Sequence, residues 1–192
     1  AMALQAGALL ARHEILVCID GDALLDAHAG HWLARHFAEP EVAAVTGNPR
    51  IRNRSTLLGR VQVGEFSSLV GIIKRAQRSF GRIFTVSGVI TAFRKSAVHG
   101  VGYWSADALT EDIDITWKLH RAGWDVRFEP NALTWILMPE TLRGLWKQRL
   151  RWAMGGAQVL LKNIDAALAP SQRSLWPLLL EMVVSVAWSY AM

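Results

Sequence analysis

The chain of 192 residues is long enough for one domain with a substantial core, and its single cysteine, Cys18, excludes an internal disulfide. Charged residues make up 19% of the sequence, below the globular average of about 25%, while the mean hydropathy is +0.19 and tryptophans number nine. This composition suits a protein that lies against a membrane or stacks aromatic rings on a ligand better than an ordinary cytosolic enzyme. The net charge of +5 favours phosphates, nucleotides, anionic lipids or nucleic acid without choosing among them.

The sequence predicts a helix at the start of the chain, followed by a short buried strand. Residues 1–14 are rich in alanine and leucine, which favour helices, and read as a helix already under way. Residues 15–19 (ILVCI) form an unbroken apolar run that stops at Asp20-Gly21-Asp22. A short apolar run bounded by turn residues is typical of a fully buried strand in the parallel sheet of an α/β protein.

Asp20 and Asp22 are candidate metal ligands at the end of that strand. Ligands of open α/β sheets bind at the carboxyl ends of the strands. Mg²⁺ and Mn²⁺ prefer hard oxygen ligands and commonly bridge one or two carboxylates to substrate phosphates. Gly21 leaves the backbone free to turn, so that both acids can face one ion. A strand-ending turn explains the same residues without a metal, because Asp and Gly also favour turns.

Helices and strands alternate along the next part of the chain. The patterns predict a helix over 28–39, a strand over 41–46, a turn that carries Arg50, Arg52 and Arg54, a long helix over 56–80 and a strand over 89–93. Alternate arginines of an extended segment share one side, where they are either solvated or available to a diphosphate or lipid headgroups. Gly88 permits a tight turn or a close approach of the backbone to a ligand.

A helix from Thr110 to about Arg121 begins with acidic residues. Thr110 is a candidate N-cap, and Gly123 ends the helix. Glu111 and Asp112 lie in the first turn, where acids usually do no more than complement the helix dipole.

The next predicted elements are two short strands, over 124–129 and 132–136, and a helix over 142–162. Gln148, Arg151 and Trp152 lie at positions i, i+3 and i+4 of this helix, so they share one face. An amide, a guanidinium and an indole together make a polar platform with an aromatic floor.

The last residues, 175–192, are almost wholly apolar. About 20 such residues are needed to span a bilayer. We expect the start of a membrane-spanning or interfacial helix here, and a buried core helix is the alternative. The expected organisation is a catalytic domain over 1–165 followed by this segment over 166–192.

Three motifs occur in order: Asp20-x-Asp22, Thr110-Glu111-Asp112 and Gln148-x-x-Arg151-Trp152. Each is weak alone, but the ordered set resembles the processive, inverting family-2 glycosyltransferases, which include cellulose, chitin, hyaluronan and poly-N-acetylglucosamine synthases. Residues 46–77, 85–94, 109–119 and 136–163 are most similar to the bacterial poly-β-1,6-N-acetylglucosamine synthases. The resemblance implies a GT-A fold. It also implies that an earlier nucleotide-binding strand is missing here, so that the domain is incomplete at its N-terminus.

The resemblance implies a role for each matching residue. Asp20 and Asp22 match the pair that holds the sugar diphosphate through Mg²⁺ or Mn²⁺, and Asp112 matches the catalytic base. The remaining matches belong to the donor and acceptor sites: Glu111, Gln148, Arg151, Trp152, Ser87 and Gly88.

The resemblance further implies transfer of N-acetylglucosamine from UDP-GlcNAc to a growing β-1,6-linked polysaccharide of biofilms. The expected location is the bacterial inner membrane, with this domain on the cytoplasmic side and a small accessory membrane subunit as a possible partner. Alternatives are a chitin, hyaluronan or cellulose type of synthase and a non-catalytic, basic membrane-surface domain. Nucleic acid is not an expected partner, because no nucleic-acid motif is present.

Overall fold

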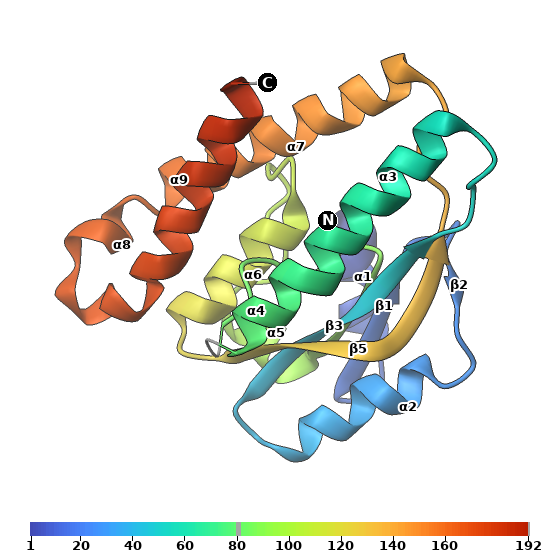
Figure 1. The fold of residues 1–192 in the computed structure, drawn as a ribbon. Coiled ribbons are helices and arrows are strands. Elements are labelled where there is room, and N and C mark those ends of the chain that lie inside the picture. Colours follow the sequence, from blue (N-terminus) through green and yellow to red (C-terminus); the bar gives the residue numbers. More distant parts are fainter. Residues whose placement is uncertain (80–81, 192) are drawn as a thin grey trace.

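The computed structural model describes residues 1–79 and 82–191, which form one sheet covered by helices on both faces (Figure 1). The strands are β1 (Ile15–Ile19), β2 (Leu24–Leu25), β3 (Val42–Ile51), β4 (Ile90–Arg94) and β5 (Asp125–Ile136). The α-helices are α1 (Met2–Leu10), α2 (Ala29–Ala34), α3 (Leu57–Ser68), α4 (Lys74–Ser79), α5 (Lys95–Gly100), α6 (Glu111–Arg121), α7 (Leu142–Lys162), α8 (Asp165–Leu168) and α9 (Trp176–Ala191). Arg35–Ala38 and Pro170–Leu175 form 3₁₀-helices, and Leu69–Ile73 form a π-helical turn. The α/β class is confirmed.

The sheet is mixed, with the strand order β1-β4-β3-β5-β2. Strands β3 and β5 pair in parallel, whereas β1 with β4, β4 with β3 and β5 with β2 pair antiparallel. The prediction of a fully buried strand in a parallel sheet over 15–19 is therefore wrong. β1 pairs antiparallel with β4 at one edge of the sheet, and Val17 and Ile19 are 45% and 46% exposed.

The apolar run of β1 has a different cause. Leu16 packs in the cluster that contains Ala8 of α1, whereas Ile15 packs on the other face of the sheet in the cluster that contains Leu33 of α2. Apolar residues at consecutive positions thus reflect helices on both faces. Such a run does not specify whether the strand is central or at the edge.

Strands β3 and β5 are longer than the sequence predicts. Residues 47–51, expected in a turn, continue β3, and residues 125–136 form one strand instead of two. The β3–β5 ladder is irregular between Thr46 and Asn48, and a Cβ atom on Gly47 would lie 2.6 Å from the Ala132 carbonyl oxygen. Gly47 thus allows the two backbones to approach closely at a bulge, so that the ladder continues past it.

The long helix expected over 56–80 is formed by α3, the π-helical turn and α4, with its final residue, Phe80, outside the described residues. The patterns did not predict the π-helical turn at Leu69–Ile73. Such a turn inserts one extra residue into the helix and changes which side chains face the protein.

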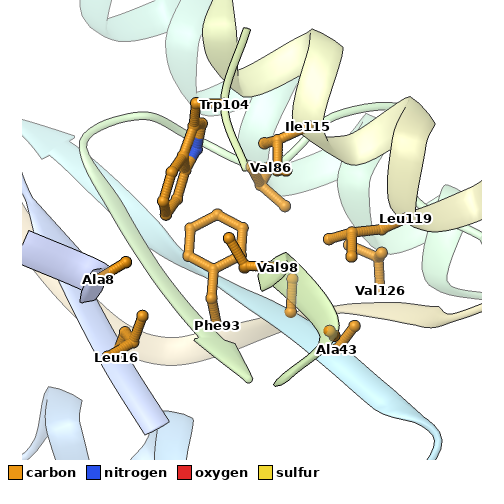
Figure 2. Packing of buried hydrophobic residues seen from close by; sticks show 12 residues of the cluster. Ala8, Leu16, Ala43, Val86, Phe93, Val98, Trp104, Ile115, Leu119 and Val126 are labelled. Carbon is orange, nitrogen blue, oxygen red and sulfur yellow. The ribbon is translucent and has the colours of Figure 1, made fainter. Parts of the chain in front are cut away.

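A hydrophobic cluster fixes α6 over the sheet (Figure 2). Ile115 and Leu119 of α6 are fully buried in it together with Phe93 of β4. The rings of Phe93 and Trp104 meet edge to face, with centroids 5.3 Å apart. This packing sets the position of the first turn of α6, which carries the predicted acids.

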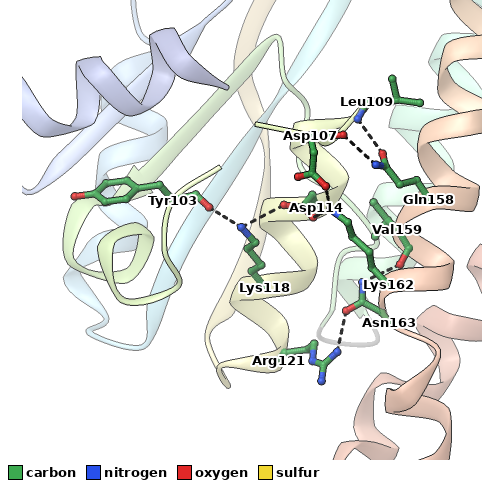
Figure 3. A network of polar contacts seen from close by, with 10 residues as sticks. All are labelled: Tyr103, Asp107, Leu109, Asp114, Lys118, Arg121, Gln158, Val159, Lys162 and Asn163. Atoms are coloured by element: carbon green, nitrogen blue, oxygen red, sulfur yellow. Dashed lines mark hydrogen bonds and ion pairs between the residues drawn. The ribbon is translucent and has the colours of Figure 1, made fainter. Parts of the chain in front are cut away.

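A network of polar contacts joins α6 to α7 on another side of the helix (Figure 3). Lys162 of α7 lies 2.9 Å from Asp107 and 3.7 Å from Asp114. Asp114 and Lys118 of α6 form an ion pair at 3.4 Å. Gln158 donates to the Asp107 carbonyl oxygen at 2.9 Å. Two helices that each carry a predicted motif are thereby held in one relative position.

Helix α9 packs one face on α6 and α7. Leu178, Leu179 and Met182 are buried in a cluster with Trp117 of α6, whereas Leu180 is 66% exposed. Within residues 1–79 and 82–191, no helix combines the length and apolar character needed to cross a bilayer. The membrane-spanning or interfacial segment expected over 166–192 stays a prediction.

Helix α7 approaches the start of α6 closely at Gly155 and Thr110. Thr110 is the N-cap residue of α6 as predicted, but its side chain makes no capping hydrogen bond. It packs instead against α7, where a Cβ atom on Gly155 would come within 3.0 Å of three Thr110 atoms. A Cβ atom on the neighbouring Gly156 would make only an ordinary contact of 3.5 Å with Val186.

We expect Gly155→Ala to lower the free energy of unfolding by about 1–3 kcal/mol, because overpacking forces α6 and α7 apart. Gly156→Ala is the matched control. It should be neutral or stabilising by up to about 1 kcal/mol, since alanine is the better helix former. Urea unfolding of both variants measures the difference, and equal effects would contradict the close approach.

Candidate active site

The loop between α4 and β4 joins the two acidic segments of the site. The Asp20 N–H donates a hydrogen bond to the Val89 carbonyl oxygen at 3.2 Å. The Gly88 N–H donates to Oδ2 of Asp112 at 3.3 Å. Two adjacent loop residues therefore hold the end of β1 and the first turn of α6 side by side. The structure thus brings together Asp20, Gly88 and Asp112, which are far apart in the sequence.

Buried threonines fix this loop. Oγ1 of Thr46 on β3 accepts a hydrogen bond from the Ser87 N–H at 2.8 Å, and Thr91 of β4 donates to the Ser87 carbonyl oxygen at 2.7 Å. Thr116 of α6 accepts from the Val86 N–H at 3.0 Å. Sequence reasoning missed these threonines, because threonine is common in strands for its shape alone.

Asp20 and Asp22 form an exposed pair directly after β1. Partial burial raises the pKa of Asp20, the carboxylates of Asp22 and Glu111 raise it further, and the Arg151 guanidinium lowers it. Side chains that follow β1 and side chains of α6 and α7 therefore all act on the charge of Asp20. A bound cation would neutralise this local excess of negative charge.

The donor set of Asp20 and Asp22 fits a hard divalent cation. No described residue donates a hydrogen bond to either carboxylate, so their oxygens are available as ligands. Residues 1–79 and 82–191 contain no group of three or more His, Cys, Asp or Glu that could hold a metal. A cation here would need further oxygens from water or a phosphate, which is the usual coordination of Mg²⁺.

Asp112 is a base candidate whose carboxyl group is held by backbone N–H groups. Its Oδ1 accepts from the Ile113 N–H at 2.9 Å, and its Oδ2 accepts from Gly88. Burial is the largest influence and raises the pKa of Asp112, and the neighbouring Glu111 carboxylate raises it as well. The N–H groups and the Lys74 ammonium act in the opposite direction. A carboxylate with a raised pKa is a stronger base than an ordinary aspartate.

Helix α7 presents Arg151 to the acid pair. The helix begins at the predicted residue, where Oγ1 of Thr141 accepts from the Gly144 N–H at 3.1 Å. Arg151 is exposed and its charge stabilises ionised Asp20. Oε1 of Gln148 is buried and has no hydrogen-bond donor among the described residues. This oxygen is therefore an acceptor that no described donor uses.

Trp152 lies partly within a hydrophobic cluster. Its indole packs against Ile51, Ile136 and Met138, and the Arg149 guanidinium lies 4.5 Å from its ring centroid. One ring face is therefore already stacked on a cation. The sequence placed Trp152 on a platform with Gln148 but did not predict that Arg149 would cover it.

The chain is similar to a known protein family and to several curated proteins. The family described as "Glycosyl transferase family group 2" matches residues 15–192. Poly-beta-1,6-N-acetyl-D-glucosamine synthases of Staphylococcus aureus (strain COL) and Staphylococcus epidermidis are each 46% identical to the chain over 191 residues. The match covers 99% of this chain and 46% of each relative. The chain thus spans about half the length of these curated relatives.

A solved structure has the same fold. It is a mannosyltransferase from Pyrobaculum calidifontis in complex with GDP-Man and Mn²⁺, with a TM-score of 0.75 and 23% identity. The match covers 98% of this chain and 50% of that one. The GT-A fold that the family resemblance implies is therefore confirmed.

The raised pKa of Asp112 predicts the effect of replacing it. Above that pKa the buried charge destabilises the folded state, so Asp112→Asn should raise the free energy of unfolding at pH 7. The gain should disappear as the pH falls toward 3.8, the ordinary value for an unfolded aspartate. Asp107→Asn is the control. It should lower the free energy of unfolding at pH 7, because the hydrogen bond from Lys162 lowers the pKa of Asp107. Urea unfolding at several pH values measures both, and a loss of stability in Asp112→Asn at pH 7 would contradict the burial.

Proposed function

The chain belongs to glycosyl transferase family group 2, and on this premise we propose that it is the catalytic domain of a processive, inverting polysaccharide synthase. The donor would be UDP-GlcNAc and the acceptor the end of a β-1,6-linked N-acetylglucosamine polymer. The 46% identity to synthases of that name supports this sugar and linkage.

One observation carries the proposal: adjacent residues of one loop hold a metal-binding pair and a base next to each other. Val89 holds the end of β1 with Asp20, and Gly88 contacts the Asp112 carboxylate. A sugar transferase needs charge stabilisation at the leaving diphosphate and a proton acceptor at the incoming hydroxyl. Asp20 with Asp22 and Asp112 are the candidates for these two tasks, and their proximity supports the proposal.

Asp112 would accept the proton of the acceptor hydroxyl. As the acceptor oxygen bonds to the anomeric carbon, the bond from that carbon to the diphosphate breaks, and the hydroxyl proton moves to the carboxylate. With Asp112 as the base and no covalent bond formed to the protein, the diphosphate is displaced from the anomeric carbon in a single step. A single displacement inverts an α-linked donor to a β-linked product.

Arg151, Gln148 and Trp152 would bind the substrates. The planar guanidinium of Arg151 suits phosphate oxygens and lies beside the acid pair. Gln148 has an acceptor oxygen that no described donor uses, and a sugar ring would contact the part of the half-buried Trp152 indole that Arg149 and the cluster leave exposed. Mg²⁺ or Mn²⁺ held by Asp20 and Asp22 would supply Lewis-acid stabilisation of the diphosphate.

The cellular setting is also part of the proposal. The resemblance to processive synthases and the exposed apolar residues of α9 support a place at the bacterial inner membrane, with the domain on the cytoplasmic side. A small accessory membrane subunit is a proposed partner. A chitin, hyaluronan or cellulose product would require the same motifs, so digestion of the product with linkage-specific hydrolases decides among them.

We expect Asp22→Asn to weaken Mn²⁺ binding in the presence of UDP by at least about tenfold. Replacing a residue that merely hydrogen-bonds a metal ligand already costs about 10–100-fold in metal affinity, and Asp22 is proposed as a ligand itself. Electron paramagnetic resonance of Mn²⁺ measures the affinity. In the unsubstituted protein, the affinity for Mn²⁺ should decrease as the pH is lowered through the raised pKa of Asp20, because the protonated carboxyl group is a poor metal ligand. Asp26→Asn is the control, since the Asp26 carboxylate is already engaged by the His28 N–H. Unchanged affinity in Asp22→Asn would remove this pair as the metal site.

Asp112→Asn in the full-length protein should reduce polymer synthesis by about 10²–10⁴-fold, since the proton acceptor is lost. Binding of UDP with Mn²⁺ should remain, because Asp112 is not one of the proposed ligands of the metal or the diphosphate. Incorporation of labelled N-acetylglucosamine into polymer and a UDP titration measure the two effects. Normal synthesis by Asp112→Asn, with Asp107→Asn as the comparison, would exclude Asp112 as the base.

A further inference from the structure

Helices α3 and α7 begin next to each other because the strands that precede them are paired. Strands β3 and β5 run in parallel, and their last residues, Ile51 and Ile136, lie opposite each other. The segments that follow the strands are joined as well. The Asn53 side-chain amide donates to the Met138 carbonyl oxygen at 2.7 Å, and the Met138 N–H donates to Oδ1 of Asn53 at 2.9 Å. Both helices therefore start at one end of the sheet (Figure 1).

Arg149 of α7 joins the two helices further along. Its Nη2 atom donates to Oε2 of Glu65 on α3 at 2.7 Å. The same guanidinium lies over the Trp152 ring, with Cζ 4.5 Å from the ring centroid. Within residues 1–79 and 82–191, Glu65 is the one side chain that forms an ion pair with Arg149. One guanidinium thus connects a carboxylate of α3 to the indole of α7, and Glu65 fixes the place of this guanidinium.

The Trp152 indole is held by its ring, whereas its polar edge is free. The ring packs in the cluster that contains Ile51, Ile136 and Met138. No atom of the described residues accepts a hydrogen bond from Nε1 of Trp152, and this nitrogen is not buried. Its N–H group is therefore available to a sugar hydroxyl, while the apolar body of the indole stays fixed.

The ion pair of Glu65 and Arg149 contributes little to stability by itself. The two side chains are 43% and 27% exposed, and pairs in such positions are screened by water and salt. The pair does restrict the guanidinium that is stacked on Trp152, and a stacked cation in turn restricts the ring. An indole that is fixed before a ligand arrives loses less conformational freedom on binding.

We propose that Glu65 and Arg149 are positioning residues for sugar transfer, which together fix the Trp152 indole in the orientation that receives the acceptor sugar. The proposal rests on the proposed function, since that function places Trp152 in the substrate-binding site. Arg149 acts through its stacking on the ring, and Glu65 acts through Arg149. Neither residue needs a contact with the substrates.

Steady-state kinetics of the full-length protein test this role, with a short β-1,6-linked N-acetylglucosamine oligomer as the acceptor and UDP-GlcNAc as the donor. Glu65→Gln removes the carboxylate charge and keeps the length of the side chain. Arg149→Met removes the stacked cation and keeps an unbranched side chain. Asp165→Asn is the matched control, because Asp165 belongs to another exposed ion pair, with Arg121 at 2.6 Å, which joins α8 to α6.

We expect the KM for the oligomer to rise about two- to tenfold in Glu65→Gln and in Arg149→Met, because the indole must then be ordered during binding. The kcat and the KM for UDP-GlcNAc should not change. The variant with both substitutions should have the same KM for the oligomer as Arg149→Met, since Glu65 acts only through Arg149. Asp165→Asn should match the unsubstituted protein in all three constants.

An unchanged KM for the oligomer in folded Glu65→Gln would overturn the role of the pair and leave the proposed function intact. An equal rise in Asp165→Asn would also overturn it, because the effect would then follow from the loss of any exposed ion pair. Absence of sugar transfer by the unsubstituted protein would instead refute the proposed function, and the role of Glu65 and Arg149 with it.

Discussion

Two hydrogen bonds from adjacent carbonyl and amide groups hold the site together. The Val89 carbonyl oxygen accepts from Asp20 at the end of an edge strand, and the Gly88 N–H donates to the Asp112 carboxylate at the start of α6. The strand and the helix belong to different parts of the sequence, and the loop fixes them to each other. Because Thr46 and Thr91 hold Ser87 from the sheet, the geometry of the site depends on the sheet and not on a flexible connection.

The same convergence creates an electrostatic problem that the chain solves from two sides. Asp22 and Glu111 raise the pKa of Asp20, and burial together with Glu111 raises the pKa of Asp112. Arg151 from α7 offsets this charge at the pair, and Lys74 from α4 offsets it at the base. Each cation comes from a helix outside the acidic segments. A divalent ion and the diphosphate of a donor would complete the balance at the pair.

The sequence predicts those parts of the site that local patterns encode. Acids at a strand end, acids in a first helical turn and three residues on one helix face are visible without a structure, and the helix over 142–162 has the predicted limits. Long-range effects are not encoded in this way. Residues 47–49 favour a turn locally, yet pairing with β5 extends β3 through them. The π-helical turn over Leu69–Ile73 was not predicted either, and an apolar run could not place β1 at the sheet edge.

The most direct test of the account is an experimental structure of the full-length protein with Mn²⁺ and UDP, in which anomalous scattering locates the metal. The account predicts a Mn²⁺ ion bridging the diphosphate to Asp20 or Asp22, on one side of the loop at Gly88 and Val89, with the Asp112 carboxylate facing the open acceptor side. A metal bound elsewhere, or Asp112 separated from the diphosphate by a rearranged loop, would contradict it.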